Sequence, residues 1–287
     1  MSIQQKSWTK LGLATALAAG LAGTACSPGT DNETPASAEA PAATPDVTDP
    51  DVAASGSSAA QVGDPGEGGE GEGGVSIAQA GTDPVVFRSA LAITEAHFLA
   101  GRDAYAAGFT DAAGEMFAHP VSEVLADMEG VLRERGVEDF TDLLLDASDA
   151  AYRGAPQADI DRHVDGVIAA LRTAADKAPD NGMDAGAVAA RVTADQIDRA
   201  ADMYGVAQRS DAYEPYLDGY GFYKAALAVM TDNRTRIEAS DADAVSDLEA
   251  ALTALGRAYP TATRPETLDE NAAQLAALAS RAMLSLG

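Results

Sequence analysis

The sequence predicts an all-α protein, an antiparallel bundle of seven or eight helices that follows a disordered N-terminal tether. Four observations favour this fold class. From residue 84 to the end, alanine, leucine and arginine are frequent, apolar residues recur with helical periodicity, and no convincing alternating strand is found. Glycine and proline divide this region into segments joined by short connections, as in bundles whose neighbouring helices are antiparallel.

Start and stop signals place the individual helices. Thr82-Asp83-Pro84 offers a cap followed by proline in the first turn, and Ser240-Asp-Ala-Asp243 has spacing close to that of a capping box. Breaks are expected where glycine or proline interrupts the pattern, as at Gly108 and Gly136. The predicted helices are 84–107, 111–134, 138–152, 157–177, 184–209, 211–232, 240–257 and 265–286.

The N-terminal region is predicted to be an export signal and a tether. Residues 1–25 have a lysine-containing start, a short apolar run and small residues near the end, as in a signal peptide. Residues 27–83 contain eleven acidic residues and no lysine or arginine. Such a segment cannot bury enough apolar surface to fold, so the domain boundaries are 1–25, 26–83 and 84–287, the last being the helical bundle.

The sole cysteine, Cys26, ends the string Leu21-Ala-Gly-Thr-Ala-Cys26, which resembles a bacterial lipobox. The resemblance implies a lipid-bearing Cys26 that anchors a periplasm-facing protein in the cell envelope. Ser27 after it implies the outer rather than the inner membrane. Gly23 replaces the usual leucine of that motif, so cleavage after Ala25 to give a soluble exported protein is the alternative.

The net charge of −26 argues against nucleic acid and against electrostatic docking on anionic lipid. An enzyme is not expected either. The mature chain has no thiol beyond the lipidated one, and it lacks a serine nucleophile elbow, a phosphate-binding glycine loop and an H-E-x-x-H string.

The candidate site consists of His97, His119 and Glu123. His97 precedes Gly108 by as many residues as His119 follows it, so an antiparallel hairpin that turns at this glycine brings both to the same height. Glu123 follows His119 by one helical turn. Pro120 is expected to interrupt this helix and to move His119 away from helical torsions.

Two imidazoles and a carboxylate suit iron, copper or zinc, and hence predict metal as the cofactor. The alternative is a buried histidine pair that only orders the hairpin. Glu95 points elsewhere on an ideal helix, and His163 is most simply an exposed residue.

A tyrosine-rich segment covers residues 204–223. Four of its tyrosines are spaced three or four apart and share one helical face, which predicts an aromatic core stripe. Asp211, Glu214 and Asp218 fall on the opposite face, as a solvated acidic stripe. In a functional alternative, Asp211, Glu214 or Tyr216 lies in the second shell of the metal or adds a ligand.

Short strings including Glu95-Ala-His97, Ala118-His119-Pro120 and Glu214-Pro-Tyr216-Leu-Asp218 resemble a group of exported helical bacterial proteins. That group is itself similar to the extracytoplasmic helical region of some bacterial iron permeases and, more remotely, to imelysin-like bundles. The resemblance implies a periplasmic helical domain with a link to iron or copper handling.

Two functions from different classes follow from these observations. The first is a lipid-anchored protein that binds or delivers a transition metal. The alternative is a structural or interaction lipoprotein without a metal site, whose acidic surface engages an envelope protein partner.

Overall fold

The computed structural model describes residues 74–287. These residues are helical, with no β-strand among them, which confirms the all-α fold class. The predicted signal peptide, the lipidation of Cys26 and the tether up to residue 73 lie outside the described residues.

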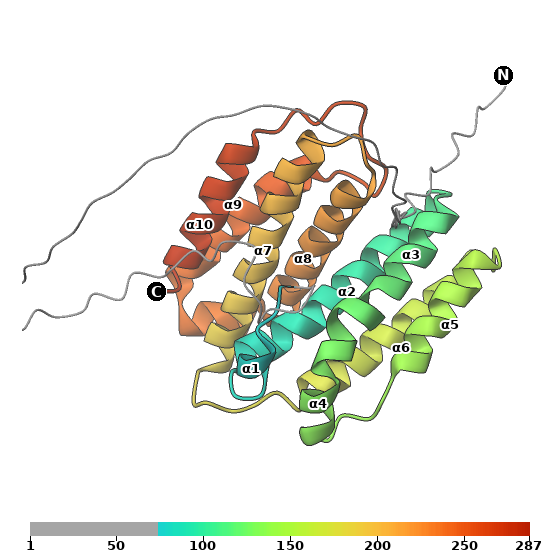
Figure 1. Cartoon of the computed structure of the whole chain (residues 1–287). Coiled ribbons are helices and arrows are strands. Elements are labelled where there is room, and N and C mark those ends of the chain that lie inside the picture. Colours follow the sequence, from blue (N-terminus) through green and yellow to red (C-terminus); the bar gives the residue numbers. More distant parts are fainter. Residues whose placement is uncertain (1–73) are drawn as a thin grey trace, which may run out of the picture. The chain divides into compact units, whose positions relative to one another are not determined.

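The helices follow one another with short connections (Figure 1). Their bounds are α1 (Ile77–Ala80), α2 (Pro84–Ala106), α3 (Thr110–Pro120), the π-helix η1 (Val121–Leu125), α4 (Ala126–Glu134), α5 (Thr141–Tyr152), α6 (Gln157–Ala175), α7 (Ala185–Gln208), α8 (Glu214–Ser240), α9 (Ala242–Ala258) and α10 (Ala272–Leu284).

Helix α2 lies at the centre, where it packs against α3, α6, α7 and α8. Figure 1 shows α3, α5 and α6 on one side of it, and α7 to α10 on the other. This position explains its composition, because most of its residues are buried, including Phe87, Ile93 and Phe98. A helix that is apolar on nearly all sides belongs in the interior of a bundle.

Small residues let α2 approach its neighbours closely. A Cβ added at Gly221 of α8 would lie 2.5 Å from the carbonyl oxygen of Ala96 and 3.0 Å from the Cβ of Ala100. A Cβ added at Gly101 would lie 2.5 Å from the Phe117 ring of α3. Glycine inside a helix lowers helix stability, and the close contact between Gly221 and the backbone of α2 explains why glycine occupies this position in α8.

Most helix boundaries agree with the predicted ones, but two do not. Helix α8 continues to Ser240, beyond the predicted end at residue 232. Helix α10 begins at Ala272, not at residue 265, because Asn271 caps it by accepting a hydrogen bond from the backbone N–H of Gln274. The intervening loop contains two prolines, which explains why the helical pattern fails there.

The folded part begins earlier than the predicted boundary at Pro84. Val75 and Ala80 are buried in the core, and the carbonyl oxygen of Gly74 accepts a hydrogen bond from Arg199 on α7. The last residues of the predicted tether therefore pack against the bundle. No helix among the described residues is long and apolar enough to cross a membrane.

Candidate metal centre

The centre lies in the hairpin that α2 and α3 form around Gly108. This glycine has a φ of 88°, a left-handed conformation that ends α2 and reverses the chain. The hairpin brings the rings of His97 and His119 together as predicted, with centroids 6.1 Å apart and planes at 73°.

Pro120 widens the helix instead of breaking it. His119 and Pro120 both belong to α3, so the prediction that His119 leaves helical torsions is wrong. Proline has no N–H to donate, and its ring crowds the carbonyl of the preceding turn. The chain accommodates this with the π-turn of η1, in which the N–H of Ala126 donates to the carbonyl of Val121, five residues back. Such π-turns are frequent at functional sites.

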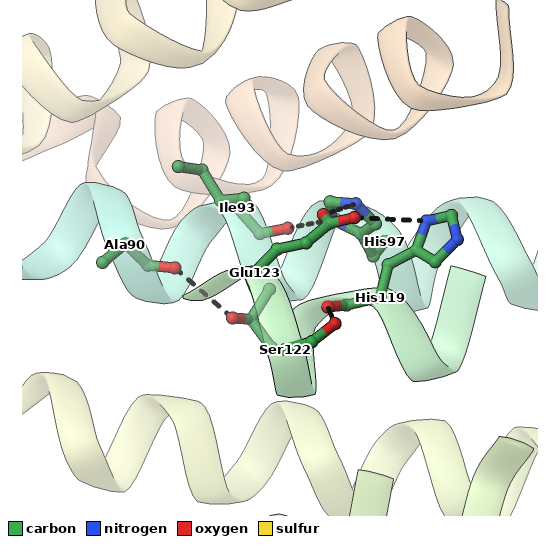
Figure 2. A network of polar contacts seen from close by, with 7 residues as sticks. Ala90, Ile93, His97, His119, Ser122 and Glu123 are labelled. Atoms are coloured by element: carbon green, nitrogen blue, oxygen red, sulfur yellow. Dashed lines mark hydrogen bonds and ion pairs between the residues drawn. The ribbon is translucent and has the colours of Figure 1, made fainter. Parts of the chain in front are cut away.

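The π-turn carries Glu123 to a position between the two imidazoles, as Figure 2 shows. Its Oε2 lies 3.9 Å from His97 Nε2, and its Oε1 lies 3.9 Å from His119 Nδ1. One ligand atom from each of the three residues falls within 4.8 Å of the other two. Both 3.9 Å separations are too long for hydrogen bonds.

The hydrogen bond of His97 fixes which nitrogen faces the centre. Its Nδ1 lies 2.8 Å from the carbonyl oxygen of Ile93, which can only accept, so Nδ1 carries the proton and donates. Burial lowers the pKa of His97 to about 4, and the ring is therefore neutral at neutral pH. Its Nε2 lone pair points toward the carboxylate of Glu123 with no proton between them.

The exposure of the three side chains is graded. His97 is only 5% exposed, whereas the side chains of His119 and Glu123 are 27% and 32% exposed. The Phe222 ring of α8 stands edge-on to His97 with centroids 6.1 Å apart, and closes the inner side of the centre. The centre thus has a fixed, buried imidazole and two outer groups that solvent can reach.

The separations match a metal centre that contracts on binding. Nitrogen and oxygen ligands at 2.0–2.1 Å from a tetrahedral ion lie about 3.4 Å apart. The two 3.9 Å separations require a contraction of about 0.5 Å, and the longest separation within the 4.8 Å limit requires at most about 1.4 Å, which the partly exposed His119 and Glu123 side chains can supply.

The predicted outer residues do not join this group. Tyr216 is buried, but its hydroxyl donates to the carbonyl of Thr261 at 2.7 Å, away from the imidazoles. Asp211 and Glu214 are exposed, and neither belongs to the cluster of possible ligands among the described residues.

Asp218 is a residue that the sequence analysis placed wrongly. It was assigned to the solvated acidic stripe, yet its Oδ1 is buried and has no hydrogen-bond partner among the described residues. Burial, followed by the charges of the Glu214 and Glu123 carboxylates, raises the pKa of Asp218 to about 8. The flanking glycines, Gly219 and Gly221, were the available signal, since they let neighbouring elements cover this side of α8.

No family model, curated protein or solved structure matches this chain. The resemblance to exported helical proteins and iron permeases therefore stays a prediction, and the geometry of the centre must carry the functional argument.

Proposed function

We propose that this protein binds a divalent transition metal, iron, copper or zinc, through His97 Nε2, His119 Nδ1 and a carboxylate oxygen of Glu123. The lipid on Cys26 would hold it in the cell envelope, facing the periplasm, where it stores the metal or delivers it to an envelope protein.

The observation that carries this proposal is the set of unpaired lone pairs at the centre. A neutral imidazole and a carboxylate face each other at 3.9 Å without a proton to share. Such an arrangement is favourable only when a cation or a bridging donor lies between the groups. Two nitrogens and one oxygen suit a transition metal better than calcium or magnesium, which prefer oxygen ligands.

The second nitrogen of His97 supports the same conclusion. Histidines that ligate metals usually donate their other N–H to a carboxylate or a backbone carbonyl, which fixes the ring and its tautomer. The hydrogen bond from Nδ1 to the Ile93 carbonyl supplies this for His97 before any metal binds. With three protein ligands, one or more coordination positions stay open for water or for an acceptor that takes the metal over.

Calorimetric titration of the metal-free full chain with Zn²⁺, Cu²⁺ and, without oxygen, Fe²⁺ tests the proposal. We expect one tight site per chain for at least one of these ions. His119→Ala and Glu123→Gln should each weaken that site more than about 100-fold, because loss of outer-shell partners alone costs 10- to 100-fold.

His163→Ala is the matched control, since His163 lies on α6 outside the cluster and should leave the tight site unchanged. Weak binding to the acidic N-terminal segment would persist in every variant and is thereby distinguished. Equal affinity in the parent and His119→Ala would refute the metal centre and leave the structural or interaction lipoprotein as the better hypothesis.

The anchor has its own test. Cys26→Ser should release the protein from the membrane fraction and remove the added lipid mass from the mature chain. A Cys26→Ser protein that stays in the membrane fraction would contradict the anchor without affecting the metal centre.

A further inference from the structure

A second site lies on the other side of α2, in a cavity of about 360 Å³ between α2, α6, α7 and α8. A volume of this size is typical of pockets for small molecules. Glu95 lines this cavity, whereas His97, two residues later, faces the metal centre. The two sites therefore use different faces of one helix and do not share residues.

Two arginines that line the cavity, Arg88 and Arg236, lie close enough to repel each other. Arg88 of α2 is half-buried; the carboxylate of Asp176 acts favourably on it, but Arg88 forms no hydrogen bond or close ion pair with the residues that the structure describes. Arg236 of α8 also lines the cavity, and its positive charge acts unfavourably on Arg88. Its Nη1 donates to the side-chain oxygen of Asn233 at 3.0 Å, which leaves the other nitrogens of its guanidinium available.

Burial lowers the pKa of Arg88 although the carboxylate of Asp176 acts to raise it, so the half-buried guanidinium is only partly compensated. An anion between Arg88 and Arg236 would remove both the desolvation cost and the repulsion. A planar carboxylate matches the fork of a guanidinium in two parallel hydrogen bonds.

Part of the cavity wall is apolar and belongs to a small cluster distinct from the main core. Ala92, Val188 and Val192 form a small hydrophobic cluster of their own, against which Met183 and Val229 pack. All five line the cavity. An apolar surface next to two arginines suits a ligand with a charged head and a hydrocarbon body.

The charged side chains at the far end of the cavity already pair with one another. Arg172 of α6 lies 3.1 Å from Asp232 and 3.9 Å from Glu95, so these charges satisfy one another. Glu95 lies two helical turns from Arg88 along α2, a distance of about 10 Å. This length limits the body of the ligand to a short chain.

We propose that this cavity binds a small organic monocarboxylate, with its head between Arg88 and Arg236 and a short apolar body against Val188, Val192 and Val229.

Calorimetry and saturation-transfer NMR on the full chain, with hexanoate as the probe, test this proposal. Hexanoate should bind with a Kd of about 1 mM or tighter, given its few heavy atoms. Hexanol and hexylamine, which keep the chain but lack the anion, should bind at least about 10-fold more weakly.

Arg88→Ala and Arg236→Gln should each weaken hexanoate binding at least about 10-fold. Arg88 forms no hydrogen bond or close ion pair, so its replacement should leave the protein folded, which circular dichroism checks. Arg234→Ala is the matched control, because Arg234 on the same helix pairs with Glu238 and Glu249 and does not line the cavity. It should leave the affinity unchanged.

Hexanol that binds as well as hexanoate, or full affinity in both arginine variants, would overturn the proposal. Binding of hexyl phosphate without hexanoate would also contradict the carboxylate assignment. Because His119→Ala should retain hexanoate binding, this result is independent of the outcome at the metal centre.

Discussion

Asp218→Asn removes an ionisable group from a buried position on α8 and leaves a neutral side chain of nearly the same shape. In the folded protein the pKa of this carboxyl is about 8, whereas in an unfolded chain it is about 3.9. The folded state therefore keeps a proton over a pH range in which the unfolded state has lost it. The contribution of Asp218 to stability is therefore greatest below the unfolded value and is lost as the pH rises through about 8.

The size of the effect follows from these two values. Between pH 6.5 and pH 8, ionisation of Asp218 should lower the free energy of unfolding of the parent by about 1.6 kcal/mol. Asp218→Asn has no proton to lose and should show no such fall. Urea unfolding monitored by circular dichroism, with a chelator present to keep the metal centre empty, measures both proteins at each pH.

Asp198→Asn is the matched control for this experiment. Burial, followed by the neighbouring Asp202 and Asp195, raises the pKa of Asp198 to about 6, so most of its titration is complete below the pH range used. The Asp198→Asn variant should lose stability as the parent does. Parallel curves for the parent and Asp218→Asn would refute the assignment of a protonated Asp218.

Three further predictions concern the α2–α3 hairpin and its contact with α8. The pKa of His97 is about 4 in the folded protein, below its unfolded value, so its contribution to stability is present above pH 6.5 and lost on acidification. Between pH 6.5 and 5, urea unfolding should show that the metal-free parent loses about 1.6 kcal/mol relative to His97→Gln. The added methyl group of Gly221→Ala would collide with the backbone of α2 and should destabilise the protein by about 1–3 kcal/mol. Gly166→Ala, in open space on α6, should stabilise the protein by about 0.5–1 kcal/mol, so equal shifts of the two melting temperatures would contradict the close approach of α8 to α2. Pro120→Ala restores an amide donor and should stabilise the metal-free protein by about 1 kcal/mol. It should also rotate Glu123 away from the two imidazoles and weaken zinc binding at least about 10-fold. An unchanged zinc titration would show that the π-turn does not position the carboxylate.

The sequence predicted most of the fold because helical periodicity and glycine or proline breaks are local properties. The prediction of helix boundaries was wrong at the loop before the last helix, where contacts distant in sequence hold the chain. The last helix was predicted to begin at residue 265, but its cap is Asn271. The long loop before it is held by tertiary hydrogen bonds such as that from Gln208 to the Leu268 carbonyl. Such long-range contacts are not visible in a local pattern.

The candidate site was predictable in part. Symmetry about Gly108 was enough to bring His97 and His119 together, because a tight turn fixes the height of both residues. The π-turn was not predictable, since proline indicates a disturbed helix without specifying how the hydrogen bonds are rearranged. Periodicity placed Asp218 on a face of α8 but could not tell what covers that face.

All three proposed ligands come from one hairpin, so closing a single short loop assembles them, at a small cost in chain entropy. A metal held there would link the two arms of α2 and α3 directly, and would resist any opening that separates them. Amide hydrogen exchange should therefore slow in the hairpin on metal addition, while the later helices, α9 and α10, keep their own opening rates. Bound metal would in this way protect the hairpin locally, without a direct effect on α9 and α10.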